Sequence, residues 1–121
     1  MGPYQAGDLS ISVVESKEPA RVFLGFDGRS IERDPRTNLG VFLSEVLAAA
    51  KASSSDIELH CQRLTYINSA TISCFVELIR NSIVQDVRLT LRYNGALAWQ
   101  RSCFKALSVL AKDDRFAIIE V

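Results

Sequence analysis

The chain has 121 residues, of which 48% are hydrophobic, and its 14 basic side chains balance 14 acidic ones. This length suits one domain with one core, and the zero net charge gives no field that would attract nucleic acid or an anionic membrane. No apolar run approaches the roughly 20 residues of a membrane-spanning helix, and the first residues lack the apolar region of a signal peptide. We therefore expect a single cytoplasmic domain over residues 1–121, without nucleic-acid or membrane partners.

Two strands are predicted near the start of the chain, after a flexible lead formed by residues 1–8. The segments Leu9 to Glu15 and Arg21 to Phe26 both alternate, at least in part, between apolar and polar residues. A turn-forming stretch at 16–19 separates them, and it contains a proline. The two strands are therefore predicted to form a hairpin.

A one-sided helix is predicted after a polar connection, with Thr37 or Asn38 as its N-cap. Its apolar residues recur at the i, i+3, i+4, i+7 spacing of a helix with one buried face. They are Leu39, Phe42, Leu43, Val46, Leu47 and Ala50. A run of three serines at 53–55 then breaks the helix.

The rest of the chain alternates strands, at 57–61, 87–93 and 115–121, with two more helices. The inward residues expected of the second helix are Ile72, Phe75, Val76, Ile79 and Ile83, with Cys74 on the opposite side. Those expected of the third helix are Leu97, Cys103, Phe104, Leu107, Leu110 and Ala111. The order β-β-α-β-α-β-α-β predicts an α/β fold with one mostly parallel mixed sheet of four to five strands and helices packed on it.

The most informative stretch is Leu64 to Ile72, between the third predicted strand and the second predicted helix. Asn68 or Ser69 falls at the expected N-cap of this helix. The hydroxyls of Ser69 and Thr71 then lie in the first turn, beside free N–H groups and the positive end of the helix dipole. A phosphoryl group added there would meet hydrogen-bond donors. Helix capping alone is also a sufficient role for Asn68 and Ser69.

The sequence does not indicate a metal site or a catalytic nucleophile. His60 is the only histidine, and the three cysteines, Cys61, Cys74 and Cys103, are widely spaced without a CxxC pair. Their spacing does not suggest a zinc site, and His60 has no partner motif for serine or cysteine catalysis. We expect buried, reduced thiols, no metal, no cofactor and no catalytic residues.

The order of elements and the stretch around Ser69 resemble the STAS domains, whose best-known members are the bacterial anti-sigma-factor antagonists. The resemblance covers nearly the whole chain and is carried by Ile57-Glu58-Leu59 as the central strand and by Leu64 to Thr71. The family pattern there is an apolar pair followed by Asp-Ser-(Ser/Thr/Ala)-Gly, and its serine or threonine after the aspartate is phosphorylated by a partner kinase. That position is Ser69. Asn68 replaces the usual aspartate, and Thr71 replaces the usual glycine.

The resemblance implies a non-enzymatic protein-binding module whose partner binding is switched by phosphorylation of Ser69, with Thr71 as the substitute. Its partners would be an anti-sigma-factor-like protein or a Ser/Thr kinase of the histidine-kinase-like ATPase fold, together with a PP2C-like phosphatase. The residues expected to bind the partner are Asn68, Ser69, Ala70, Thr71, Ser73 and Trp99.

Two other hypotheses stay open. A constitutive STAS-like scaffold domain could have kept the fold and lost the switch, and the substitutions at Asn68 and Thr71 favour it. A small-ligand sensor is the third hypothesis, although the chain has no glycine-rich phosphate loop. The oligomeric state is left open, a homodimer included.

Overall fold

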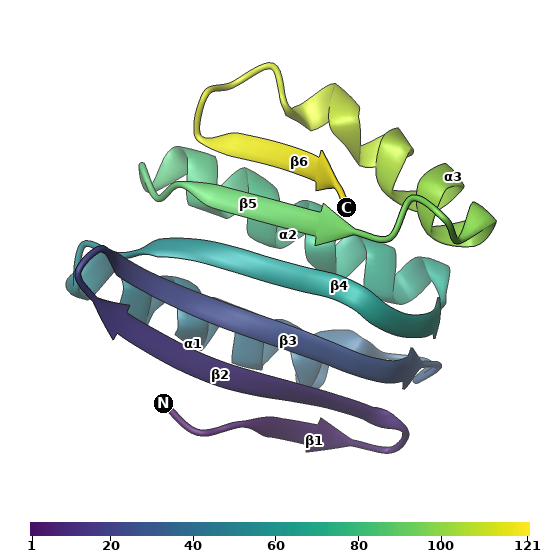
Figure 1. The fold of residues 1–121 in the computed structure, drawn as a ribbon. Helices are drawn as coiled ribbons and strands as arrows, with labels where there is room; N and C mark the ends of the chain where they lie inside the picture. The colour runs from purple at the N-terminus through teal and green to yellow at the C-terminus, as the bar shows by residue number, and fades with distance from the viewer.

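The computed structural model describes residues 1–121 as one six-stranded sheet with three α-helices (Figure 1). The strands lie in the order β1-β2-β3-β4-β5-β6 across the sheet. They are β1 (Tyr4–Ala6), β2 (Leu9–Lys17), β3 (Ala20–Ser30), β4 (Asp56–Ile67), β5 (Leu89–Tyr93) and β6 (Phe116–Glu120). The helices are α1 (Leu39–Ala52), α2 (Ser69–Val84) and α3 (Ala98–Ala106), with short 3-10 helices η1 (Pro35–Thr37) and η2 (Leu107–Leu110).

The predicted α/β fold and the mostly parallel mixed sheet are confirmed. The pairs β1–β2 and β2–β3 are antiparallel, whereas β3–β4, β4–β5 and β5–β6 are parallel. None of the helices is long and apolar enough to cross a membrane.

The predicted number of strands is wrong, because the segment expected to be a flexible lead contains β1. Tyr4 pairs with Ile11, and Ala6 pairs with Leu9. Gly7 adopts a φ of 56° in the turn between β1 and β2, a conformation that favours glycine. The ring of Tyr4 also packs 5.0 Å from that of Phe42. Three residues are too few to show an alternating pattern, so this strand could not be recognised in the sequence.

The helices cover one face of the sheet and leave the other without a helical layer (Figure 1). We call these the covered face and the bare face. The hydrophobic core lies between the covered face and the helices, and it includes the eight residues that the periodicity most clearly predicts to be buried. These are Phe42, Val46, Leu59, Ile79, Leu89, Leu91, Phe104 and Leu107. All six apolar residues predicted for the buried side of α1 are buried as well.

The inward face predicted for α2 is only partly correct. Phe75 and Ile79 are buried, but Ile72 is only half-buried, and Cys74, expected on the opposite side, is 4% exposed. The physical reason is that α2 packs against α1 as well as against the sheet. The buried side of α2 is therefore turned toward α1, and it includes Leu78.

Strand β4 is longer than predicted and changes the shape of the candidate site. It continues to Ile67, so Thr65 to Ile67 form a strand rather than a loop. Asn68 alone then connects β4 to α2. The candidate residues therefore sit directly on the carboxyl end of a central strand, at the sheet edge where open α/β sheets bind their ligands.

Candidate functional site

The start of α2 is capped by Asn68, one of the two caps that the sequence allowed. Asn68 has extended backbone angles, with φ −87° and ψ 172°, and its Oδ1 accepts a hydrogen bond from the N–H of Thr71 at 2.9 Å. The N–H of Ile72 donates to the carbonyl of Asn68. Ser69 is therefore the first residue inside the helix, and the N–H groups of Ser69 and Ala70 are left free in its first turn.

Asn68 and Thr71, the two positions that depart from the STAS pattern, form one hydrogen-bonded network. The Thr71 hydroxyl donates to Asn68 Oδ1 at 2.7 Å and lies 2.6 Å from the Ser30 hydroxyl at the end of β3. The Asn68 amide donates through Nδ2 to the Glu32 carbonyl at 2.8 Å. An aspartate carboxylate has no N–H to make this last bond. Both departures therefore fasten the start of α2 to the end of β3.

The two candidate hydroxyls have opposite environments. Thr71 is 1% exposed, and its hydroxyl is engaged on both sides by Asn68 and Ser30. Ser69 is exposed, and its side chain makes no hydrogen bond. Ser73, one turn later, is also exposed, and its hydroxyl donates to the carbonyl of Ser69 at 3.2 Å. Among the hydroxyl-bearing residues in the first two turns of α2, only Ser69 and Ser73 are thus exposed.

Exposed apolar side chains flank the start of α2. Ile31 is 51% exposed and Tyr66 is 52% exposed. Ile31 follows Ser30, whose carbonyl accepts a bond from the N–H of Asn68, and Tyr66 lies at the end of β4, two residues before Asn68. We call Ile31, Tyr66, Ser69 and Ser73 the Ser69 surface. It combines two exposed serine hydroxyls, of which only that of Ser69 makes no hydrogen bond, with apolar contact area.

Trp99, the other residue expected to bind a partner, lies on α3 and is half-buried. Its ring packs 6.2 Å from that of Phe104, so its aromatic contact is with the core rather than with Ser69.

Sequence reasoning missed Gln100, which is fully buried on α3. Its Nε2 donates to the carbonyls of Cys61 and Leu64 at 2.8 and 3.0 Å, and its Oε1 accepts from the N–H of Asn94 at 2.7 Å. Gln100 therefore ties α3 and the loop after β5 to β4. Its i, i+4, i+7 spacing with Phe104 and Leu107 was a signal that could have placed it on the buried side of the helix.

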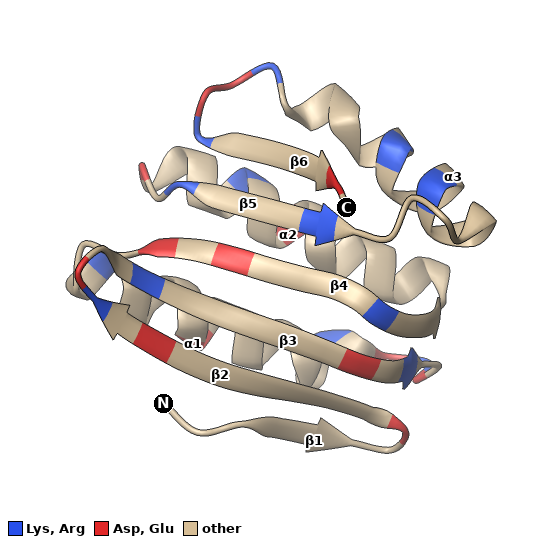
Figure 2. Cartoon of the chain, in the orientation of Figure 1, with Lys and Arg blue, Asp and Glu red and all other residues tan.

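A second missed cluster surrounds Glu58 on the bare face. Its carboxylate bonds Arg92 at 2.7 Å, His60 at 3.1 Å and Arg21 at 3.3 Å. Figure 2 shows basic positions on β3 and β5 on either side of the acidic positions on β4. Burial by itself raises the pKa of Glu58, but the hydrogen bonds and charges of Arg92 and His60 outweigh it, so the pKa of this carboxyl is lowered.

The three thiols are free, and burial raises the pKa of each of them. Cys61 and Cys74 are buried, whereas Cys103 is partly exposed. His60 lies on the bare face, whereas its neighbour Cys61 points to the covered face. No group of three or more metal-ligating side chains gathers anywhere in the chain.

In comparisons with known proteins, the chain matches no family model and no curated protein.

Proposed function

We propose that this protein is a non-enzymatic, cytoplasmic STAS-like module of the anti-sigma-factor-antagonist type, whose binding to a protein partner is switched by phosphorylation of Ser69. The observation that carries the proposal is the contrast between two neighbouring hydroxyls. Ser69 is exposed and free, whereas Thr71 is buried and bonded on both sides. A kinase could reach Thr71 only after the first turn of α2 had opened, and this supports Ser69 over Thr71 as the proposed site.

In the unmodified state, the partner would dock on the Ser69 surface. Ile31 and Tyr66, which lie within two residues of the hydrogen bond between Asn68 and Ser30 at the start of α2, would supply apolar contact area. A phosphate on Ser69 would add about −1.5 to −2 charges. Taking that charge out of water beside apolar groups is unfavourable, so the phosphorylated surface would release the partner.

The fold itself would tolerate the modification. The free N–H groups of Ser69 and Ala70 and the helix dipole would stabilise a phosphate by about 0.3–1 kcal/mol. The Asn68–Thr71–Ser30 network does not involve the Ser69 side chain and would hold the helix start in place. The switch would thus change the surface without unfolding α2.

The STAS resemblance suggests the classes of partner. A Ser/Thr kinase of the histidine-kinase-like ATPase fold, or an anti-sigma-factor-like protein, would bind and modify the surface, and a PP2C-like phosphatase would reverse the modification. The protein itself would contribute binding and no catalysis.

A constitutive scaffold is the second candidate, and the network around Thr71 favours it. Because Asn68, Thr71 and Ser30 fix the start of α2 without any phosphate, this edge is already ordered as a permanent docking surface. The two candidates differ only in whether a charge at Ser69 changes partner binding.

The test combines phosphosite mapping with binding by matched variants. Protein isolated from its native host should carry phosphate on Ser69. In pull-downs from host extract, Ser69→Ala should retain the partner, and Ser69→Asp should reduce its recovery about tenfold or more. Ser108→Asp, the same change at an exposed serine of η2 outside the Ser69 surface, should leave recovery of the partner unchanged.

Two outcomes would contradict the switch. Absence of phosphate together with normal binding by Ser69→Asp would leave the scaffold, and phosphate on Thr71 alone would show that the helix start opens. Circular dichroism of each variant would establish that the fold is intact.

A further inference from the structure

Strand β6 lies at one edge of the sheet and pairs only with β5 (Figure 1). The N–H of Val121 donates to the carbonyl of Tyr93, and the carbonyl of Arg115 accepts from the N–H of Leu89. Because the backbone groups of successive residues in a strand point to alternate sides, every second residue from Arg115 to Val121 faces β5. The residues between them direct their N–H and C=O groups away from the sheet.

The residues that face outward are Phe116, Ile118 and Glu120. The N–H of Phe116 donates to the carbonyl of Asp113 in the preceding turn. The carbonyl of Phe116 and both backbone groups of Ile118 and Glu120 have no main-chain partner in the chain. A row of unpaired N–H and C=O groups is a template for pairing with another strand.

The opposite edge of the sheet is protected, whereas β6 is not. Strand β1 has only three residues and follows Pro3, and short strands and prolines both protect sheet edges. Strand β6 has five residues, contains no proline or basic residue, and pairs with β5 without a bulge. On the bare face, Ala117 is exposed, Ile119 is 38% exposed and Val121 is 61% exposed. This edge therefore combines free backbone groups with exposed apolar side chains.

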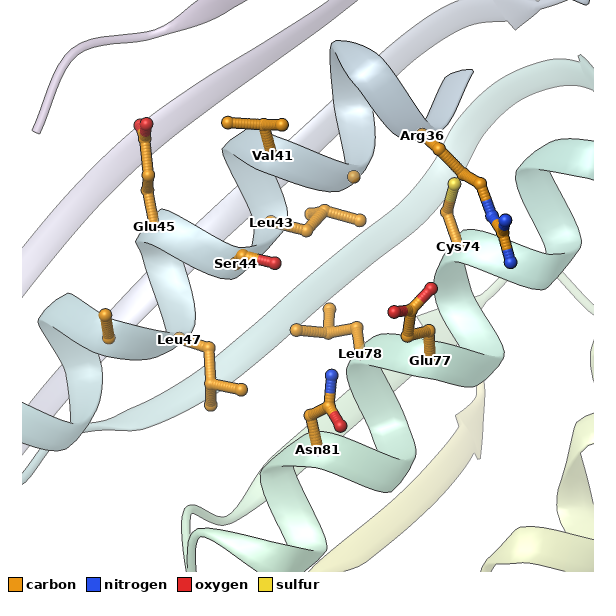
Figure 3. A pocket seen from close by; sticks show the side chains of 12 residues that line it. Arg36, Val41, Leu43, Ser44, Glu45, Leu47, Cys74, Glu77, Leu78 and Asn81 are labelled. Carbon is orange, nitrogen blue, oxygen red and sulfur yellow. The ribbon is translucent and has the colours of Figure 1, made fainter. Parts of the chain in front are cut away.

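The helical side of the molecule offers no comparable surface. Figure 3 shows the hollow between α1 and α2, whose lining includes Leu43, Leu47 and Leu78. Each of these leucines is 3% exposed or less and belongs to the core. The hollow thus has no free apolar floor, and the edge of β6 is the better candidate for contact with another chain.

We propose that β6 pairs in antiparallel orientation with β6 of a second copy of this chain, about a two-fold axis at Ile118. The two Ile118 residues would then exchange two hydrogen bonds, and the N–H of each Glu120 would donate to the carbonyl of Phe116 in the other copy. All of these bonds use groups that have no main-chain partner in the single chain. The N–H of Phe116, already bonded within its own chain, is not needed.

This edge is complementary to itself, as a symmetric dimer requires. The two-fold axis places Ala117 opposite Ile119 of the second copy, so the exposed apolar side chains of both edges meet on the bare face. It also places each Glu120 opposite Phe116 of the other copy, so the two Glu120 carboxylates do not face each other. The antiparallel arrangement that symmetry imposes is also slightly more stable per residue than a parallel one.

The dimer would be closed and would leave the Ser69 surface free. The protected β1 strands would form both outer edges of the joined sheet, so pairing would stop at two copies. Because the two β6 strands run in opposite directions, the carboxyl ends of the strands around them, and with them the two Ser69 surfaces, would lie at opposite ends of the dimer. The pairing goes beyond the proposed switch and does not depend on the state of Ser69.

The test is sedimentation velocity of the full unphosphorylated chain over a range of concentrations. It should show one reversible step from one copy to two at concentrations below about 1 mM. Amide hydrogen exchange followed by NMR should show that exchange at the N–H groups of Ile118 and Glu120 slows as the dimer forms.

Two pairs of variants decide whether β6 is the interface. Glu120 is exposed, and Glu120→Pro removes an outward N–H without breaking a bond to β5. This variant should dimerise about tenfold or more weakly, whereas Glu120→Ala, which keeps the N–H, should stay within about threefold of the unaltered chain. Ile119→Lys puts a charge on the edge and should also weaken dimerisation. Val14→Lys, the same kind of change on the bare face of β2, should not.

Three results would overturn the proposal. A chain that stays monomeric up to about 1 mM would mean that two copies do not pair, as expected if the edge receives an extended segment of another protein. Equal dimerisation in either pair of variants would show that the copies meet at another surface. Assemblies larger than two copies would show that β6 pairing does not form a closed dimer. Circular dichroism of each variant would establish that the fold is intact.

Discussion

The two faces of the sheet differ in the residues that the same strands place on them. On the covered face, Leu24, Leu59 and Leu91 lie on adjacent strands, and each is 0% exposed. One residue earlier in each strand, the row across the bare face contains Phe23, Glu58 and Thr90. Parallel sheets are usually covered on both faces.

The bare face replaces a helical layer with a charge network. Glu58 is only 7% exposed although no helix lies over it, because Arg21, Arg92 and His60 surround its carboxylate. No buried side-chain polar atom in the chain lacks a hydrogen-bond partner. Apolar packing and paired charge are therefore two different means of burying the two sides of one strand, and their contributions to stability should differ in size and in pH dependence.

Truncating a side chain of the core beneath the covered face should lower the free energy of unfolding more than any change on the bare face. Phe104 is fully buried, and its ring lies near those of Phe75, Tyr93 and Trp99. Phe104→Ala should lower the free energy of unfolding by about 3–5 kcal/mol, because it removes a buried ring and leaves a cavity. Urea unfolding followed by circular dichroism would measure this. Val109→Ala, at a residue 64% exposed on η2, is the control, and a loss at Phe104 below about 1 kcal/mol would show that the core is misplaced.

A matched pair of valines compares the faces directly. Val22 in β3 is 4% exposed on the covered face, and Val14 in β2 is 59% exposed on the bare face. Val22→Thr should destabilise by about 1–3 kcal/mol, because it buries a hydroxyl in the core. Val14→Thr should change the free energy of unfolding by less than about 0.5 kcal/mol. Equal effects in thermal or urea unfolding would mean that the two faces are buried alike.

Removing the charge of Glu58 should lower the free energy of unfolding less than the two core substitutions do, and the loss should depend on pH. The folded pKa of Glu58 is lowered, so its stabilisation is present above its ordinary pKa of 4.5 and is lost as the pH falls through the folded value. Glu58→Gln should therefore lower the free energy of unfolding by about 1–2 kcal/mol at neutral pH.

The difference between Glu58→Gln and the unaltered protein should shrink as the pH falls below about 5. Glu77→Gln, at an exposed carboxylate without an ion pair, should leave the pH profile unchanged. A constant difference at all pH values would mean that the network acts through packing rather than through charge.

Much of the candidate site could be predicted from the sequence, because it depends on local geometry. The position of a helix N-terminus after a strand follows from the change in periodicity, and Asn68 was one of two possible caps. The accessibility of the hydroxyls could not be predicted in the same way. Ser69 and Thr71 lie in the same helical turn, and only the approach of Ser30 from β3, 41 residues from Thr71 in sequence, buries one of them.

The sequence by itself determined the α/β class, the order of the central elements and the buried side of α1, since these follow from periodicities of two and 3.6 residues along one segment. Tertiary structure alone decided which side of α2 is buried and the pairing of β1 with β2. It also decided the hydrogen bonds of Gln100 to β4 and the ion pairs around Glu58. Each of these depends on residues that are distant in sequence and become neighbours only when the strands pair and the helices pack. From the sequence alone, a polar side chain such as Gln100 or Glu58 is predicted to be exposed, because its hydrogen-bond partners on other strands are not known.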